Sequence, residues 1–95
     1  MKNKKNTDFK KELSELHKEM KTIGPMMRGS ITIMGKKNKQ PYFSVGVDGK
    51  TKVIYLGNKR AEIAGEYVNN YKRMLEIADR MTIINMNILK STPTN

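Results

Sequence analysis

The dipeptide Asp48-Gly49 constrains the fold most, because it separates two runs in which apolar and polar residues alternate. An Asp-Gly pair in this position is typical of a two-residue β-hairpin turn. Such a turn fixes the strand register, so we expect Val47 to lie opposite Lys50 and the pairing to continue outward from there. The sequence therefore predicts two antiparallel strands, at 42–47 and 50–56.

This register gives the hairpin two faces of different chemistry. One face is apolar except near the turn and holds Phe43, Val45, Val47, Lys50, Lys52 and Ile54. The other face is aromatic and rich in hydroxyl groups, and holds Tyr42, Ser44, Gly46, Thr51, Val53 and Tyr55. We expect the first face to pack on a helix and the second to be partly open.

Helical patterns lie on both sides of the hairpin. Apolar residues at spacings of three and four predict a helix that begins at Thr7 or Asp8 and ends before Gly24-Pro25; they are Phe9, Leu13, Leu16, Met20 and Ile23. A further strand is predicted at 30–34, and a long helix from Asn58 to about Lys90. The predicted fold is α+β, in the order α-β-β-β-α. A single domain over 7–90 would follow a disordered basic tail at 1–6 and precede a frayed end at 91–95.

The long helix carries more apolar residues than the rest of a small domain can cover. Its surplus forms a stripe of Ile77, Met81, Ile84 and Ile88. A continuous helix would offer this stripe to a second copy or a protein partner. Alternatively, the helix breaks near 79–82 and folds back on the first helix, which would cover the stripe within one chain.

The positive charge is unevenly distributed along the chain. The net charge is +10, and residues 28–60 hold eight Lys or Arg against Asp48 alone. Residues 7–24 and 61–95 are each neutral, and the remaining excess lies in the three lysines of residues 1–6. A block of one sign between neutral segments indicates an anionic partner, and nucleic acid fits it best.

The open face and its flanking cations form the predicted binding site. Base or sugar contacts are predicted for Tyr42, Ser44, Thr51 and Tyr55. Phosphate contacts are predicted for Arg28, Lys36, Lys37, Lys39, Lys50 and Lys52. The alternative for Tyr42 and Tyr55 is a cross-strand pair that only stabilises the sheet.

Enzymatic chemistry has little support in the sequence. The chain has no cysteine, which excludes disulfides and Cys-ligated metal sites, and its only histidine is His17, on a Lys- and Glu-rich helix flank. No glycine-rich phosphate loop is present. We therefore expect a non-enzymatic protein with no catalytic residue, metal, cofactor or small-molecule substrate. The N-terminus lacks the apolar core of a signal peptide and no apolar run could span a bilayer, so a cytoplasmic location without membrane contact is expected.

Five segments together resemble an uncharacterised prokaryotic family of small proteins that is seen with mobile elements. They are Arg28-Gly29-Ser30-Ile31, Gln40-Pro41-Tyr42-Phe43, Asp48-Gly49-Lys50-Thr51, Val53-Ile54-Tyr55-Leu56-Gly57 and Asn70-Tyr71-Lys72-Arg73. Many members carry a cysteine knuckle where this chain has residues 34–39 without cysteine, so metal binding does not carry over. The hairpin at 48–56 and the strand order are also similar to the arm-binding domain of tyrosine-type integrases, which implies a sheet laid into the DNA major groove.

These observations favour a DNA-binding protein. Two other functions stay open. The chain could be a phage or mobile-element inhibitor that binds a nuclease or its guide RNA complex, or an accessory protein that binds RNA or the ribosome.

Overall fold

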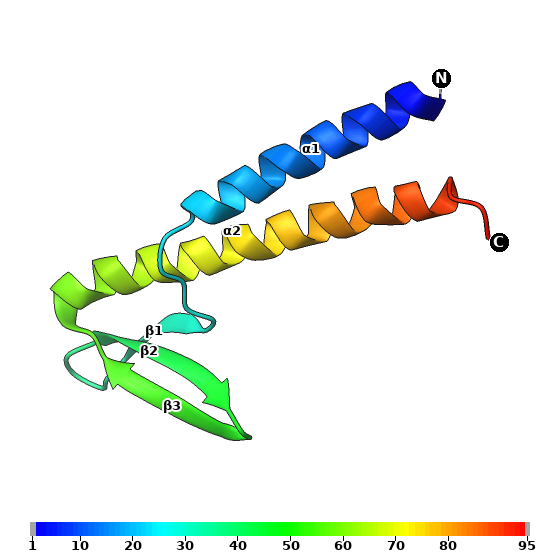
Figure 1. The fold of residues 1–95 in the computed structure, drawn as a ribbon. Helices are drawn as coiled ribbons and strands as arrows, with labels where there is room; N and C mark the ends of the chain where they lie inside the picture. The colour runs from blue at the N-terminus through cyan, green and yellow to red at the C-terminus, as the bar shows by residue number, and fades with distance from the viewer. Residues whose placement is uncertain (1, 95) are drawn as a thin grey trace. The chain divides into compact units, whose positions relative to one another are not determined.

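Along the chain, a helix is followed by three strands that form one antiparallel sheet, and then by a second, longer helix (Figure 1). The computed structural model describes the backbone of residues 2–94 and the side chains of residues 8–94. Its elements are α1 (Lys2–Thr22), β1 (Ser30–Met34), β2 (Gln40–Val47), β3 (Lys50–Tyr55) and α2 (Gly57–Lys90). The predicted α+β class and the order α-β-β-β-α are confirmed.

The hairpin register is the one that the Asp-Gly turn predicts. Val47 lies opposite Lys50, and Tyr42 lies opposite Tyr55 at the other end of the pair. Asp48 and Gly49 have φ angles of 53° and 76°, the positive values that a two-residue turn of this type requires. On the other side of β2, Ile31 of β1 lies opposite Phe43. β2 is therefore the central strand, and β1 and β3 are the edges.

The chain divides into two compact units. One unit is Gly24–Lys72, which contains the sheet and the first turns of α2. The other consists of Met1–Ile23 and Arg73–Asn95 and pairs α1 with the second half of α2. The single domain over 7–90 stays a prediction.

In the sheet unit, α2 packs on the face of the sheet that carries Phe43. The core consists of Phe43, Leu56, Ala64 and Val68, with Met27, Ile31, Val45 and Ala61 packed against it. Ala61 and Ala64 are the α2 residues of this group that have small side chains. The chain before β1 lies directly against the sheet, since a Cβ on Gly29 would lie 2.5 Å from the Phe43 ring, and Gly29 has a φ of 151°. The predicted packing of this face on a helix is confirmed.

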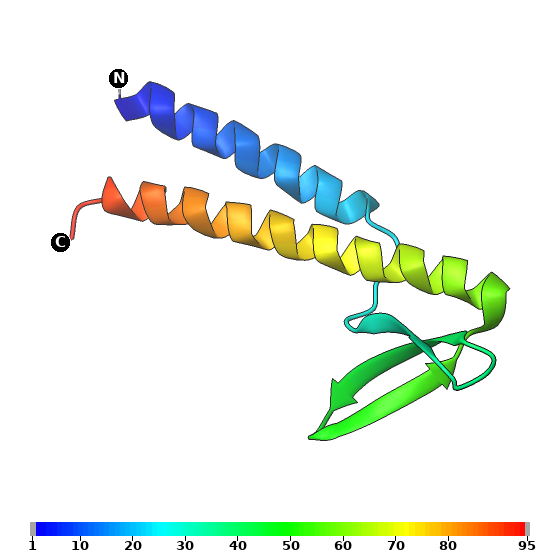
Figure 2. The same cartoon turned by 180° about the vertical axis from the view of Figure 1, so that it is seen from behind.

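In the helical unit, α1 runs antiparallel to the second half of α2 (Figure 2). Glu12 pairs with Arg80, and Glu19 pairs with Arg73. Arg73, Ile77, Arg80 and Ile84 follow one another at spacings of four, three and four, so all four lie on one side of α2. That side faces α1, and there Ile77 and Ile84 are 1% and 0% exposed.

α1 differs from the sequence expectation at its start, whereas α2 is the continuous long helix that was expected. α1 begins at Lys2 rather than at Thr7 or Asp8, so residues 2–6 of the predicted disordered tail are helical in the structure, while Met1 lies outside the described residues. Residues 2–6 contain only Lys and Asn, without the Gly or Pro that would stop a helix. α2 continues through 79–82 without the alternative break. No fold-back is needed, because α1 already covers the stripe. Among the described residues, neither helix has an apolar stretch that could cross a membrane.

Candidate nucleic-acid interface

The face of the sheet opposite Phe43 is the candidate interface, and we call it the open face. The strand register places on it Thr32, Tyr42, Ser44, Thr51, Val53 and Tyr55. Val53 and Tyr55 are exposed, and Tyr55 is 48% accessible to solvent. The predicted aromatic and hydroxyl-bearing surface therefore exists, and it includes Thr32 of β1, which the sequence reasoning did not select.

Tyr42 and Tyr55 form a cross-strand pair on this face. Their ring centroids are 5.4 Å apart and the rings meet edge to face at 66°. The Tyr55 hydroxyl donates a hydrogen bond to Oε1 of Gln40 at 3.3 Å. Edge-to-face contact stabilises the pair, so the structural alternative predicted for these tyrosines is present. The pair also fixes the orientation of the Tyr55 ring while leaving about half of its surface accessible.

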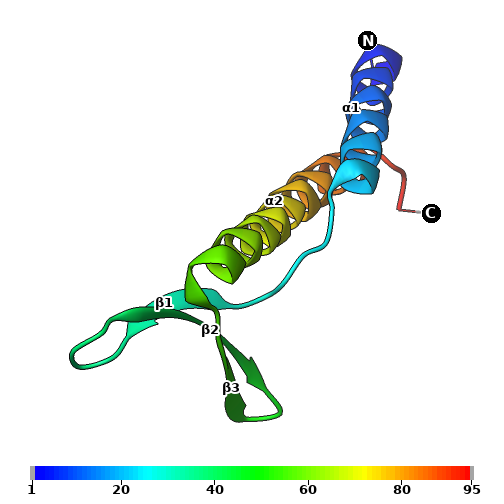
Figure 3. The ribbon, with the colours of Figure 1, turned by 90° about the vertical axis from the view of Figure 1, so that its left-hand side faces the viewer.

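The predicted phosphate-binding cations divide into separate groups. Lys36, Lys37 and Lys39 lie in the loop between β1 and β2, and all three are exposed. Met34 pairs with Gln40, and Gln40 accepts the hydrogen bond of Tyr55. The loop therefore lies at the end of the sheet that carries Tyr42 and Tyr55. Figure 3 shows the loop and the β2–β3 turn at opposite ends of the sheet.

The other three predicted cations lie away from that end. Lys50 follows the β2–β3 turn, and the register places Lys50 and Lys52 on the face of Phe43 rather than on the open face. Arg28 donates a hydrogen bond from a guanidinium nitrogen to the Gly46 carbonyl at 2.8 Å. The pairing of β1 with β2 begins at Ser30, opposite Ser44. Arg28 therefore bonds to the backbone of β2 at a position where β1 no longer pairs with it.

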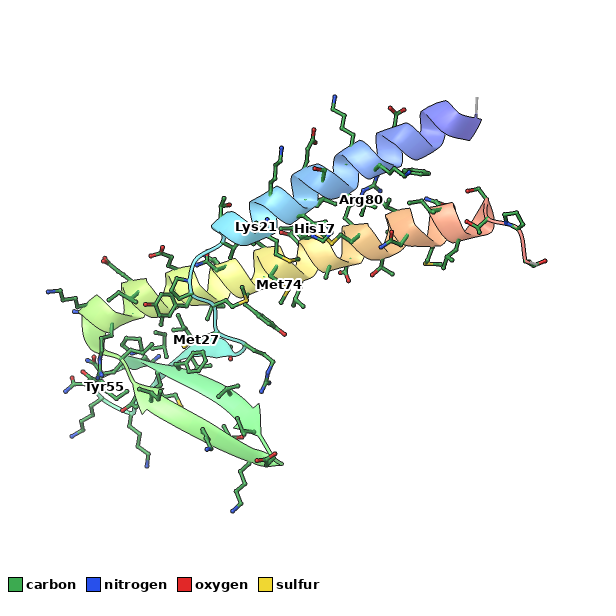
Figure 4. All side chains as sticks on the ribbon, viewed as in Figure 1. His17, Lys21, Met27, Tyr55, Met74 and Arg80 are labelled. Carbon is green, nitrogen blue, oxygen red and sulfur yellow. The ribbon has the colours of Figure 1, made fainter. Side chains whose placement is uncertain are left out.

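One cation near the open face was missed by the sequence reasoning. Arg60, in the first turn of α2, donates from Nε to the Leu56 carbonyl at 3.1 Å and from a terminal nitrogen to the Tyr55 carbonyl at 2.7 Å. Its guanidinium group is therefore held at the end of β3, next to Tyr55, which Figure 4 labels. The available signal was its spacing of four and five residues after the two carbonyls that it reaches.

The predicted dimer or partner interface has a different environment from the one expected. Ile77 and Ile84 are buried, and Met81 and Ile88 are half-buried. The exposed large apolar residues of this part of α2 are instead Leu75, Ile83, Met86 and Leu89. The predicted stripe is therefore covered in part within the chain, and association through this helix stays a prediction.

The described residues show no group of three or more His, Asp or Glu side chains placed to hold a metal ion. His17 is exposed on α1. No family model matches the chain, and neither does any curated protein or solved structure, so both resemblances stay predictions.

Proposed function

We propose that the chain is a nucleic-acid-binding protein that uses the open face together with the loop between β1 and β2. The observation that carries the proposal is the grouping of three loop lysines, the exposed Tyr55 ring and the fixed guanidinium of Arg60 at one end of the sheet. Lysines bind phosphates as point charges, and an exposed aromatic ring contacts bases or sugars.

Duplex DNA is the favoured target. The major groove of DNA admits a two-stranded β-ribbon, and the hairpin of β2 and β3 presents small hydroxyl-bearing side chains, Ser44 and Thr51, on the open face. The deep, narrow major groove of RNA helices excludes such an element. An RNA target would therefore be single-stranded and stack on Tyr55.

The test is a titration of a fluorescent DNA duplex at several salt concentrations. The logarithm of the affinity should fall linearly with the logarithm of salt concentration, with a slope of about 0.9 per phosphate contact. Changing Lys36, Lys37 and Lys39 together to Glu should remove up to about three phosphate contacts. The slope should become less steep by the corresponding amount, and binding should weaken strongly. These side chains are exposed in a loop, so circular dichroism and thermal unfolding should change little.

A matched control moves the same charge change to the helical unit. Lys10, Lys11 and Lys18 are exposed on α1, and changing them together to Glu alters the net charge by the same amount. Equal losses in both triple variants would show that only net charge matters and would contradict a site at the loop. An absence of binding at low salt would contradict the proposal altogether. A single-stranded RNA of equal length separates the two nucleic-acid classes.

A further inference from the structure

β3 is an edge strand whose outer side is open. All six of its residues are exposed. Residues next to a two-residue turn form a hydrogen-bonded pair, and such pairs alternate along an antiparallel ladder. Lys50, Lys52 and Ile54 therefore direct their backbone groups toward β2, whereas Thr51, Val53 and Tyr55 direct theirs outward.

Two hydrogen bonds agree with this alternation. The Leu56 amide donates to the Pro41 carbonyl at 3.0 Å, on the inner side of the edge. The Tyr55 carbonyl accepts from Arg60 at 2.7 Å, on the outer side. Arg60 therefore already bonds to the outward carbonyl of Tyr55. The outward amides and carbonyls of Thr51 and Val53 are the groups of β3 that remain for an added strand.

An apolar groove lies along the same edge, on the side of the sheet that faces α2. Its volume is about 220 Å³, and its lining includes Met27, Phe43, Ile54, Ile63 and Tyr67 together with Arg60. Ile54 on β3 and Ile63 on α2 are 52% and 45% exposed. A side chain placed next to Ile54, beyond the edge of β3, would therefore enter the groove and cover both isoleucines.

The charges beside the groove are positive. Lys50 and Lys52 lie on the same side of β3 as Ile54, and Arg60 is part of the groove itself. No carboxylate is among the groove-lining residues that the structure describes. An incoming strand with acidic residues opposite the two lysines would form favourable cross-strand pairs.

We propose that the β3 edge and this groove bind an extended acidic segment of a partner protein as an added strand of the sheet. In antiparallel orientation, the segment places a large apolar residue opposite Ile54 and acidic residues opposite Lys52 and Lys50. Because alternate residues share a face, its sequence pattern is apolar-x-acidic-x-acidic. Main-chain hydrogen bonds to Thr51 and Val53 supply affinity, and the groove and the lysines select the side chains.

A second copy of the chain fits this edge less well. Pairing of two β3 strands would bring Lys50 and Lys52 of both copies onto one side of a continuous sheet, where like charges repel. Lysines on an edge strand discourage such self-pairing. The same lysines favour an acidic strand, so the charge of β3 discriminates between the two occupants.

The test uses the full chain and a blocked synthetic peptide, acetyl-Thr-Leu-Thr-Glu-Thr-Glu-Thr-amide, followed by amide NMR. We expect saturable shifts of the Thr51 and Val53 amides at micromolar peptide concentrations. N-methylation of the third residue, the Thr between Leu and the first Glu, blocks the hydrogen bond that its amide donates to the Val53 carbonyl and should weaken binding by about tenfold. N-methylation of the first Glu, whose amide points away from β3, is the matched control and should preserve binding.

A charge reversal tests the side-chain part of the proposal. Lys50→Glu with Lys52→Glu should lose the acidic peptide and gain the same peptide with Lys in place of both Glu residues. Ile63→Ser, at a half-exposed helix position, should weaken both complexes without unfolding the protein. The triple Glu variant of the β1–β2 loop should bind the peptide normally, which keeps this site separate from the nucleic-acid proposal.

Three results would overturn the proposal. One is an absence of Thr51 and Val53 shifts at millimolar peptide. Another is equal binding of both N-methylated peptides. The third is a concentration-dependent shift of the same amides without peptide, which would assign the edge to a second copy of the chain.

Discussion

At the scale of single residues, two arginine–glutamate pairs connect the helices of the helical unit. Glu12 and Glu19 are seven residues apart on α1, and their partners Arg80 and Arg73 are seven apart on α2. Each arginine offers Nε and a terminal nitrogen to both carboxylate oxygens. Figure 4 labels Arg80, which lies between the two helices. Such two-point contacts fix the register of the antiparallel pair as well as stabilising it.

These pairs make the stability of the helical unit depend on pH. The hydrogen bond from Arg80 lowers the pKa of Glu12, and the hydrogen bond from Arg73 lowers the pKa of Glu19, both below the ordinary value of 4.5. A lowered folded-state pKa means that the unfolded chain binds protons more readily. The stabilisation is therefore complete above pH 4.5 and is lost as the pH falls through the lower, folded-state values.

We predict that replacing Glu12 and Glu19 together with Gln removes this acid sensitivity. The melting temperature of the parent protein should drop between pH 5 and pH 3, and the drop should be smaller in the double variant. Thermal unfolding followed by circular dichroism measures both. Glu15→Gln is the control, because Glu15 makes no ion pair among the described residues. An equal acid-induced drop in the double variant would contradict the assignment of these pairs.

At the scale of elements, α2 buries different sides in its two halves. Ala64 and Val68 are buried in the sheet unit, and Ile77 and Ile84 are buried in the helical unit. An uninterrupted helix of 34 residues is therefore apolar on more than one side because each half has its own packing partner. The apolar residues on the two sides of α2 therefore correspond to two packing neighbours, not to one broken helix.

We predict that Ile84→Ala destabilises the protein far more than Ile83→Ala. Ile84 is fully buried and Ile83 is 49% exposed, so the two variants remove the same atoms from the same helix. The buried change should cost about 2–5 kcal/mol of unfolding free energy, and the exposed one about 0.5 kcal/mol or less. Urea denaturation measures both. Similar losses would mean that α1 does not cover this side of α2.

At the scale of the whole molecule, association through α2 depends on which side of the helix stays exposed. Met86 is two residues after Ile84, and Leu75 is two residues before Ile77, so each is about 160° from its buried neighbour. Together with Ile83 and Leu89 they form an exposed apolar stripe. Water-exposed stripes of this kind favour association.

We predict that any dimer of this chain is lost when Met86 and Leu89 are changed together to Lys. Multi-angle light scattering at high micromolar concentration should then give the single-chain mass of 10.9 kDa. Ile84→Lys should instead lower the melting temperature, since it places a charge at a buried position. A single-chain mass for the parent protein at every concentration would contradict the dimer.

The sequence alone determined the local parts of the fold. Asp48-Gly49 specified the turn and, through it, the pairing of Tyr42 with Tyr55 and the two faces of the hairpin. Gly24-Pro25 specified the end of α1, which stops at Thr22. Turn residues and helix breakers act through their own backbone preferences, which need no distant partner. The order of helices and strands could be predicted for the same reason.

Only the tertiary structure decided which side of α2 is buried and how the cations divide. Glu12 and Arg80 are 68 residues apart in the sequence, so no local pattern could pair them or place α1 over Ile84. The groove beside β3 could not be predicted, because its walls come from the segment before β1, from the sheet and from α2. Burial is set by what packs against a residue, and that depends on contacts between segments that are distant in the chain.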